Sequence, residues 1–317
     1  MRAMARGLRY ERLVTERANR ASAHLDRLDA LGIAALMNRE DARVVRAVAR
    51  VARDIAGAVN LIVAALRSGG RLIFVGAGTS GRLGVLEAAE CPPTFGTPPS
   101  LVQGIMAGGR AAVFRSREGA EDDARAGAQA IRARARAGDV VVGVSASGVT
   151  PFVRGALTAA RRVGAKTVLV TCNARVASRA SAGRSRANVT IAPDPGPEVL
   201  AGSTRLKAGT ATKLVLNTLT TASMARVGKV YGNRMVDVQP RSRKLRARAA
   251  RLVAELGDVS PARARQLLAA ANGRVPVAIV MARRRLRSAA AAEALRAAGS
   301  LRPALEQSGA RRRAMRR

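Results

Sequence analysis

The fold of this chain is decided by residues 71–84, RLIFVGAGTSGRLG. The apolar run 71–75 is typical of a buried strand, and the turn of glycines and hydroxyls after it leads into a helix-like segment. In such a unit the loop N–H groups and the helix N-terminus converge on a spot that favours an anion. Thr79 and Ser80 add hydroxyl donors there, between Gly78 and Arg82. We therefore predict a phosphate site; a glycine-rich turn without a ligand is the alternative.

Short apolar runs alternate with helix-like stretches over the next hundred residues. The runs are 71–75, 101–106, 140–144, 166–170 and 188–191, and the helices expected between them are 81–90, 118–137 and 151–163. Runs rich in β-branched residues, without apolar–polar alternation, suit strands that are buried on both faces. The sequence thus predicts an α/β fold, a three-layer sandwich around a central parallel sheet.

A second hydroxyl-rich loop follows the run at 140–144. It contains Ser145, Ser147, Gly148 and Thr150, and Pro151 then opens a helix, a position that favours proline. Ligands of open parallel sheets bind at the carboxyl ends of the strands, where this loop and the turn at 76–82 would both lie. We predict that the two loops hold one phosphate between them.

Residues 196–210 form a polar loop that runs into an apolar helix. Ser203, Thr204 and Lys207 are candidates to contact the rest of a phosphorylated ligand, although Ser203 and Thr204 could also merely cap the helix. Lys207 is one of only five lysines among 56 basic residues. Because ammonium and guanidinium groups differ in hydration and geometry, we expect the retained lysines to be needed as lysines.

The chain divides by composition into four segments. Residues 1–68 are predicted to be an N-terminal helical segment, in which residues 38–41 cap a long amphipathic helix. Residues 69–244 form the α/β domain. Residues 245–305, rich in alanine and arginine, form a small helical C-terminal domain, and the basic tail, 306–317, is expected to be disordered.

The net charge of +35 suggests nucleic acid as a partner. However, aromatic residues make up 2% of the chain, so platforms for base stacking are nearly absent, and the arginines are spread over the whole length. We expect only non-specific, charge-driven binding of nucleic acid. Two cysteines indicate a reducing compartment, with the cytoplasm as the default. We expect no membrane span. The single histidine, His24, has no cluster of ligands nearby, so no metal site is predicted.

Several stretches of the sequence match one known family. They are Thr15-Glu16 with Asn19, residues 37–41, 76–84, 90–96, 118–122, 145–148 and 202–210, and residues 230–233 with 235–237. In this order they resemble the N-acetylmuramic acid 6-phosphate etherases over residues 13–300.

The resemblance implies a sugar-isomerase-type (SIS) α/β domain with a small C-terminal helical domain. It implies a carbon–oxygen lyase that cleaves the D-lactyl ether of N-acetylmuramic acid 6-phosphate, giving N-acetylglucosamine 6-phosphate and D-lactate, in cell-wall sugar recycling and amino-sugar catabolism. It also implies a homodimer that uses neither a metal nor another cofactor. The alternative is a non-catalytic sugar-phosphate sensor, similar to the glucokinase regulatory protein, which is a longer chain with two such domains.

The resemblance also implies roles for individual residues. Glu90 would be the acid/base at C3, and Glu121 the second catalytic carboxylate, acting at C2. Two carboxylates can share this work when their surroundings separate their pKa values. Without the resemblance, each would be interpreted as an ordinary carboxylate of a helix. The residues implied to bind the substrate are Gly78, Thr79, Ser80, Arg82, Ser145, Ser147, Gly148, Thr150, Ser203, Thr204 and Lys207.

The sequence departs from the family pattern at two places. Val149 replaces a residue that is usually basic or polar, which would weaken the hold on phosphate or shift substrate preference. Residues 240–243 replace the family's Ala-Thr-Asn before Lys244-Leu245, so no role is assigned to that segment.

Overall fold

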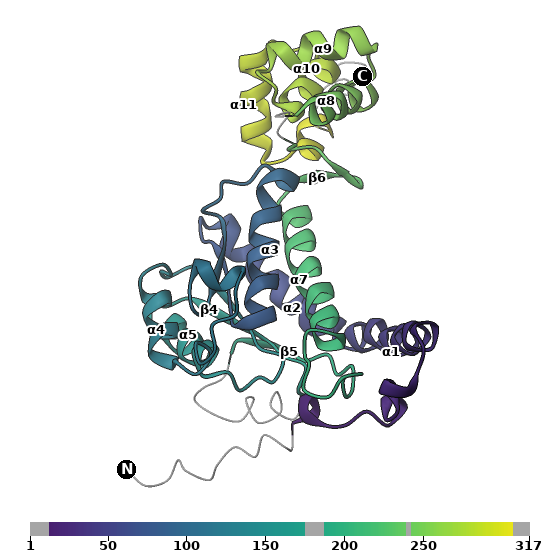
Figure 1. The fold of residues 1–317 in the computed structure, drawn as a ribbon. Helices are drawn as coiled ribbons and strands as arrows, with labels where there is room; N and C mark the ends of the chain where they lie inside the picture. Colours follow the sequence, from purple (N-terminus) through teal and green to yellow (C-terminus); the bar gives the residue numbers. More distant parts are fainter. Residues whose placement is uncertain (1–12, 175–186, 239–241, 307–317) are drawn as a thin grey trace. The chain divides into compact units, whose positions relative to one another are not determined.

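The computed structural model of the protein describes residues 13–174, 187–238 and 242–306. Its centre is a five-stranded parallel sheet with the strand order β2-β1-β3-β4-β5 (Figure 1). Each strand lies within one residue of a predicted apolar run, and β1 and β3 are buried along their whole length. The strands are β1 (Leu72–Gly76), β2 (Val102–Met106), β3 (Val140–Val144), β4 (Lys166–Val170) and β5 (Val189–Ile191).

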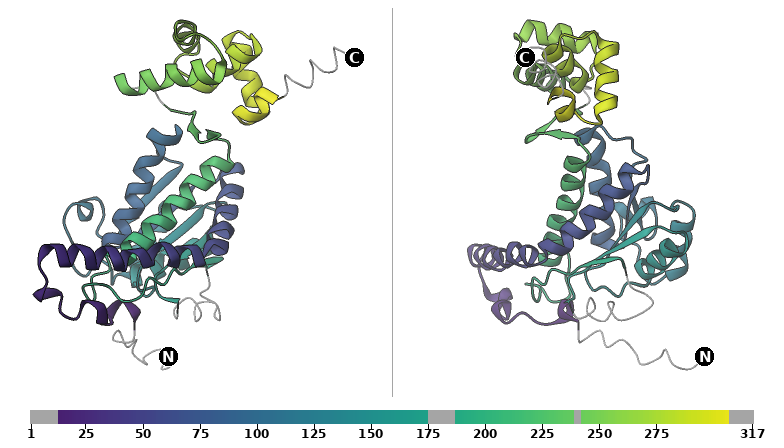
Figure 2. Two further views of the ribbon diagram at one scale, coloured as in Figure 1. Left: turned by 90° about the vertical axis from the view of Figure 1, so that its right-hand side faces the viewer. Right: turned by 180° about the vertical axis from the view of Figure 1, so that it is seen from behind.

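Helices cover both faces of the sheet, which confirms the predicted three-layer α/β sandwich (Figure 2). On one face, α4 (Ala124–Arg132) and α5 (Pro151–Arg162) share a core with the strands. On the other face, α2 (Ala52–Arg67) contacts β3 and β5. On the same face as α2, Gly84 of α3 (Gly78–Phe95) packs directly against the side chain of Phe74 in β1.

The turn from β1 into α3 requires glycine at two positions. A Cβ atom on Gly76 would lie 2.7 Å from the Gly81 nitrogen, and one on Gly81 would lie 2.7 Å from the Gly76 oxygen. With no side chain in this gap, the helix can begin directly above the end of the strand. As a result α3 starts at Gly78, three residues before the predicted start at 81, and Thr79 and Ser80 lie in its first turn.

Residues 38–41 do not cap a helix, so that prediction is wrong. They lie inside α1 (Ala30–Arg50), whose cap is the Asp29 side chain, which accepts the Gly32 N–H. Before α1 the chain forms short 3-10 helices instead of a regular α-helix, namely η2 (Val14–Glu16), η3 (Arg20–Ser22) and η4 (Leu25–Arg27).

The helix expected at 118–137 is also shorter than predicted. It is α4, and residues 118–123 before it form turns. Gly119, with a φ of 74°, and the Asp123 side chain, which accepts the Ala126 N–H, place the helix start at Ala124. Glu121 therefore lies in a turn and not on a helix.

The chain forms two compact units. The first contains residues up to Ala88 and Ser100–Thr220, and the second contains Ala89–Pro99 and the chain from Thr221 onward. These limits differ from the compositional segments, because 89–99 and 221–244 group with the helical unit. Residues 307–317 of the predicted tail lie outside the described residues. Within the described part of the chain, no helix is both long enough and apolar enough to cross a lipid bilayer.

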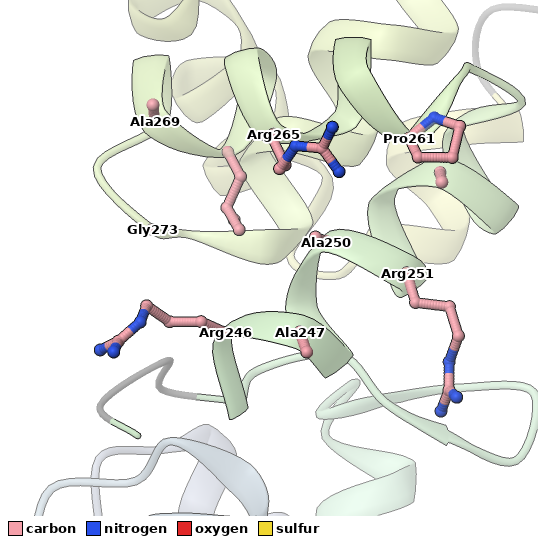
Figure 3. A pocket seen from close by; sticks show the side chains of 10 residues that line it. Arg246, Ala247, Ala250, Arg251, Pro261, Arg265, Ala269 and Gly273 are labelled. Carbon is pink, nitrogen blue, oxygen red and sulfur yellow. The ribbon is translucent and has the colours of Figure 1, made fainter. Parts of the chain in front are cut away.

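The second unit is a helical bundle with a short hairpin. Ser260 caps α9 (Pro261–Ala270) by accepting the Arg263 N–H, and Pro261 is the first residue of the helix. A hollow of about 720 Å³ opens between α8 (Arg243–Gly257) and α9, and its lining includes Ala250, Leu268 and three arginines, Arg246, Arg251 and Arg265 (Figure 3). The elements are β6 (Val230–Tyr231), β7 (Arg234–Met235), α8 (Arg243–Gly257), α9 (Pro261–Ala270), α10 (Val275–Arg284) and α11 (Ser288–Ala298).

Candidate active site

The loops after β1 and β3 lie side by side at the carboxyl edge of the sheet. β1 and β3 are parallel neighbours, with Gly76 in register with Val144. Since β2 lies on the other side of β1, the strand order reverses between β1 and β3. Open parallel sheets bind their ligands at such a switch point. The first turn of α3 and the loop 145–150 thus face one shared space, as the sequence predicts.

The loop 145–150 is held in place by its own hydroxyls. The hydroxyl oxygens of Ser145 and Thr150 lie 2.7 Å apart, and Ser145 Oγ accepts the Gly148 N–H at 3.0 Å. Gly148 has a φ of 74°, which glycine adopts without strain. Asn173, after β4, donates its Nδ2 to the Ser147 carbonyl. A loop fixed in this way loses little conformational entropy when it binds an anion.

The third loop meets the first at the start of α7 (Lys207–Arg226). A Cβ atom on Gly209 would lie 3.7 Å from Thr79 Cγ2 and 3.5 Å from the Thr204 oxygen. The first turn of α7 therefore packs against the first turn of α3. Ser203 and Thr204 are half-buried just before it. The structure brings the three predicted loops together, and their ligand stays a prediction.

A small cavity of about 130 Å³ lies beside the first turn of α3. Gly78, Arg82, Glu118 and Glu121 are among the residues that line it. The Arg82 guanidinium donates to two backbone oxygens of η5 (Arg110–Val113), at 2.8 and 2.9 Å. Arg82 thus ties the segment after β2 to α3 and shapes a wall of the cavity.

Glu121 is placed between this cavity and the loop 145–150. Its carbonyl oxygen accepts the Phe152 N–H in the first turn of α5 at 2.9 Å. The close approach of α4 and α5 keeps this contact, since a Cβ atom on Gly127 would lie only 2.0 Å from the Phe152 oxygen. Glu121 is exposed. One of the two predicted catalytic carboxylates therefore stands beside the predicted phosphate loop.

Glu90 lies farther along α3. It is exposed and comes twelve residues after Gly78 on the same helix, which corresponds to a rise of about 18 Å at the usual rise per residue. The helix continues through Pro92 and Pro93 to its end at Phe95. Within one chain, α3 does not bring Glu90 to the turn at Gly78.

Lys207 lies inside the protein. Its Nζ donates to Glu40 Oε2 at 2.8 Å, and both side chains are 0% exposed. Asn19 Nδ2 donates to the same oxygen, also at 2.8 Å. Burial alone would raise the pKa of Glu40, but the hydrogen bonds from Lys207 and Asn19, and the charges of Lys207 and Arg43, hold that pKa below its ordinary value. The ammonium expected to contact the substrate is therefore engaged by Glu40.

Glu198 caps the N-terminus of α7. Its carboxylate accepts the backbone N–H groups of Lys207 and Ala208 at 2.8 and 2.9 Å. Burial raises the pKa of Glu198, and these two hydrogen bonds only partly oppose that effect. Sequence reasoning missed Glu198, Glu40 and Asn173 as supports of the site. The one signal was the place of Glu40 within the stretch 37–41 and of Glu198 just before the stretch 202–210, and no such signal marks Asn173.

Known proteins that resemble this chain decide the family. Residues 54–161 match the family model described as the glucokinase regulatory protein N-terminal SIS domain. The N-acetylmuramic acid 6-phosphate etherase of Gloeobacter violaceus is 54% identical over 93% of this chain and 95% of its own length. This chain belongs to the N-acetylmuramic acid 6-phosphate etherases.

A second named etherase agrees with this family, and a solved structure is similar to part of the chain. The etherase of Symbiobacterium thermophilum is 52% identical over 86% of this chain and 89% of its own. The phosphoheptose isomerase of Francisella tularensis has a TM-score of 0.48 at 17% identity, covering 62% of this etherase and 100% of its own chain. Together with the parallel sheet and its two helical layers, the family model confirms the predicted SIS-type α/β fold.

Proposed function

We propose that this etherase cleaves the D-lactyl ether at C3 of N-acetylmuramic acid 6-phosphate, releasing N-acetylglucosamine 6-phosphate and D-lactate. The observation that carries the proposal is the 54% identity to a named etherase over 93% of the chain. The chain also has both carboxylates that this chemistry needs, Glu90 and Glu121. The enzyme is accordingly a carbon–oxygen lyase.

The chemistry requires one acid/base at C2 and one at C3. When the sugar ring opens, C1 is an aldehyde, so a base can remove the proton on C2. The C3–O bond then breaks and lactate leaves, taking a proton from an acid. Water adds back at C3 of the unsaturated aldehyde, and a proton returns to C2. The net change consumes one water and needs no oxidant or reductant. We assign Glu121 to the proton on C2 and Glu90 to the leaving oxygen and the attacking water.

The substrate phosphate is assigned to the shared space between α3 and the loop 145–150. The first backbone N–H groups of a helix have no partner within the helix and carry its positive dipole end, so they suit a phosphate. Ser203 and Thr204 are assigned to the sugar. The groups proposed to hold the phosphate are the Gly78 and Gly148 backbone and the hydroxyls of Thr79, Ser80, Ser145, Ser147 and Thr150.

We propose a homodimer in which a second copy supplies Glu90. The rise of about 18 Å along α3 separates Glu90 from the turn at Gly78, so the two ends of this helix cannot serve one small sugar. Glu121, in contrast, lines the cavity beside Gly78. In a two-fold dimer, Glu90 of each copy can face Glu121 of the other.

We place this reaction in the cytoplasm. Among the described residues, neither Cys91 nor Cys172 forms a disulfide, and both are buried, which agrees with a reducing compartment. Non-specific contact with nucleic acid follows from the charge of +35 and has no part in the reaction.

The test is release of D-lactate by the purified protein. We expect wild type to release D-lactate and N-acetylglucosamine 6-phosphate in equal amounts. The rate of D-lactate release should fall at least about a hundredfold in Glu90→Gln and in Glu121→Gln, because general acid–base catalysis contributes a factor in this range. Glu118→Gln is the matched control, because Glu118 lines the same cavity and has no assigned proton, so it should keep most activity. Binding of sugar phosphate without turnover by wild type would instead indicate the regulator.

A further inference from the structure

We propose that Glu40 is a positioning residue for the substrate loop, defined as residues 196–206, and that the N-terminal segment 13–22 acts with it. The inference rests on the proposed function, because it takes Ser203 and Thr204 in that loop to contact the sugar. Glu40 itself touches no substrate. It acts through Lys207 and Asn19.

The substrate loop is tied at both of its ends to buried carboxylates. Near its start, Glu198 accepts the N–H groups of Lys207 and Ala208, which closes the loop onto the first residues of α7. Just after its end, the Lys207 ammonium donates to Glu40 on α1, so the loop is also tied to a second element. Ser203 and Thr204 lie between these two ties.

The N-terminal segment holds the same loop from the other side. Asn19 Nδ2 donates both to Glu40 Oε2 and, at 3.2 Å, to the Pro197 carbonyl. The Gly202 N–H donates to the Thr15 carbonyl at 3.1 Å. Glu40 thus stands where the N-terminal segment, α1 and the start of α7 meet.

A shift at this junction would move two parts of the site together. The first turn of α7 packs on Thr79, through the space left by Gly209. If the ammonium of Lys207 lost its partner, the start of α7 would move. Both Ser203 and Thr204, which are assigned to the sugar, and Thr79, which is assigned to the phosphate, would then change position relative to it. A buried ion pair is seldom more stabilising than apolar residues of the same shape. Its hydrogen bonds are directional, however, and those of Glu40 fix where the loop ends.

The experiment compares two isosteric changes that each neutralise a fully buried carboxylate of an ion pair. Glu40→Gln removes the negative charge that faces the Lys207 ammonium and leaves an amide in its place. The matched control is Asp139→Asn: Asp139 is 0% exposed, bonds Arg71 at 2.6 Å, and precedes β3, at the edge of the sheet opposite the site. Both variants should unfold at a lower temperature. Only Glu40→Gln should raise the KM for the muramic acid substrate, by about tenfold or more, the factor that 1.4 kcal/mol represents, with kcat changed much less.

A second variant and a binding measurement keep the result clear if Glu40→Gln folds poorly. Asn19→Ala leaves the Lys207–Glu40 pair in place and removes the tie to Pro197, so its KM should rise by a smaller factor. Affinity for N-acetylglucosamine 6-phosphate, measured by calorimetry, should weaken in the same order. If wild type binds this sugar phosphate but releases no lactate, the proposed function fails, and the affinities still decide the positioning role. Unchanged KM and affinity in folded Glu40→Gln and Asn19→Ala would overturn the inference.

Discussion

Lysine is rare in this chain, and the lysines between 207 and 229 all hold carboxylates. The expectation that a retained lysine is needed as lysine agrees with these contacts. Of these lysines, only Lys207 is fully buried, and there the compact ammonium differs in size and geometry from the planar guanidinium of arginine. The pairs are Lys207–Glu40 at 2.8 Å, Lys213–Glu87 at 2.7 Å and Lys229–Asp237 at 2.7 Å.

Stability should fall in acid partly through Asp139. Burial alone would raise its pKa, but hydrogen bonds from the Arg71 side chain and from the Arg136 and Arg71 N–H groups hold that pKa below the ordinary 3.8. A carboxyl whose pKa is lowered by folding contributes stability above its unfolded value and loses it as the pH falls through the folded value. Between about pH 5 and about pH 3, the unfolding temperature of wild type should therefore drop more than that of Asp139→Asn.

Thermal unfolding followed by circular dichroism over this range checks the prediction. Asp122→Asn is the matched control, because it makes the same substitution at an exposed carboxylate. Parallel curves for wild type and Asp139→Asn would contradict the assignment to Asp139.

Cys172 should be inert towards thiol reagents in the folded protein. Burial raises the pKa of its thiol to about 12; a hydrogen bond with the Thr212 side chain opposes this rise, and the charges of Glu198 and Asp194 add to it. Because the thiolate is the nucleophile, almost none is available at pH 8. Alkylation by iodoacetamide, located by mass spectrometry, should reach Cys172 only when denaturant is added. Rapid labelling of the native protein would show that the site opens.

At the scale of elements, the strands could be predicted closely and the helix ends could not. Runs such as 140–144 are bounded by turn residues and match β3 residue for residue, since a strand buried on both faces leaves an unbroken apolar run. Helix starts depend on single capping contacts. Asp29 caps α1, although residues 38–41 look like the better cap in sequence. Gly119 and Asp123 shorten α4 in the same way.

The contact between α4 and α5 should tolerate no side chain at Gly127. A Cβ atom there would lie 2.0 Å from the Phe152 oxygen, and the neighbour is backbone, which cannot turn aside. Gly127→Ala should lower the free energy of unfolding by about 1–3 kcal/mol or more. It should also lower etherase activity, because the Phe152 N–H holds the Glu121 carbonyl.

Gly57→Ala is the control for this substitution. Gly57 also lies inside a helix, α2, but the nearest atom to its Cβ position is 3.8 Å away. Alanine there should raise the free energy of unfolding by about 0.5–1 kcal/mol, since it restricts the unfolded chain and favours the helix. Denaturant unfolding of both variants makes the comparison. Equal effects of the two changes would contradict the packing argument.

At the scale of the whole molecule, the sequence predicts which loops meet but not what supports them. The meeting of the loops after β1 and β3 follows from the order of parallel strands. The pair Glu40–Lys207 joins residues 167 positions apart, and no local pattern marks one as the partner of the other. The separation of Glu90 from Gly78 follows from the length of α3. The predicted helix, 81–90, covers part of α3, so the sequence indicates part of this separation.

The proposed homodimer predicts that two inactive variants restore each other. If Glu90 and Glu121 of one site come from different copies, a mixed dimer of Glu90→Gln and Glu121→Gln has one intact site and one doubly altered site. Mixing equal amounts with exchange of subunits should then give about a quarter of wild-type activity, because half of the dimers are mixed and half of their sites are intact. Activity that stays at the level of the single variants would place both carboxylates in one chain.

The most direct test of the elimination and water addition is to run the reaction in water labelled with oxygen-18 and to measure the molecular mass of both products by mass spectrometry. Breaking the C3–O bond and adding water at C3 should place one labelled oxygen in N-acetylglucosamine 6-phosphate, in addition to any exchanged at the aldehyde, and none in D-lactate. Reduction of the aldehyde to the alcohol before further analysis by fragmentation separates the label at C3 from the label at C1. Label in the lactate, or no lactate from the wild-type protein, would contradict the account.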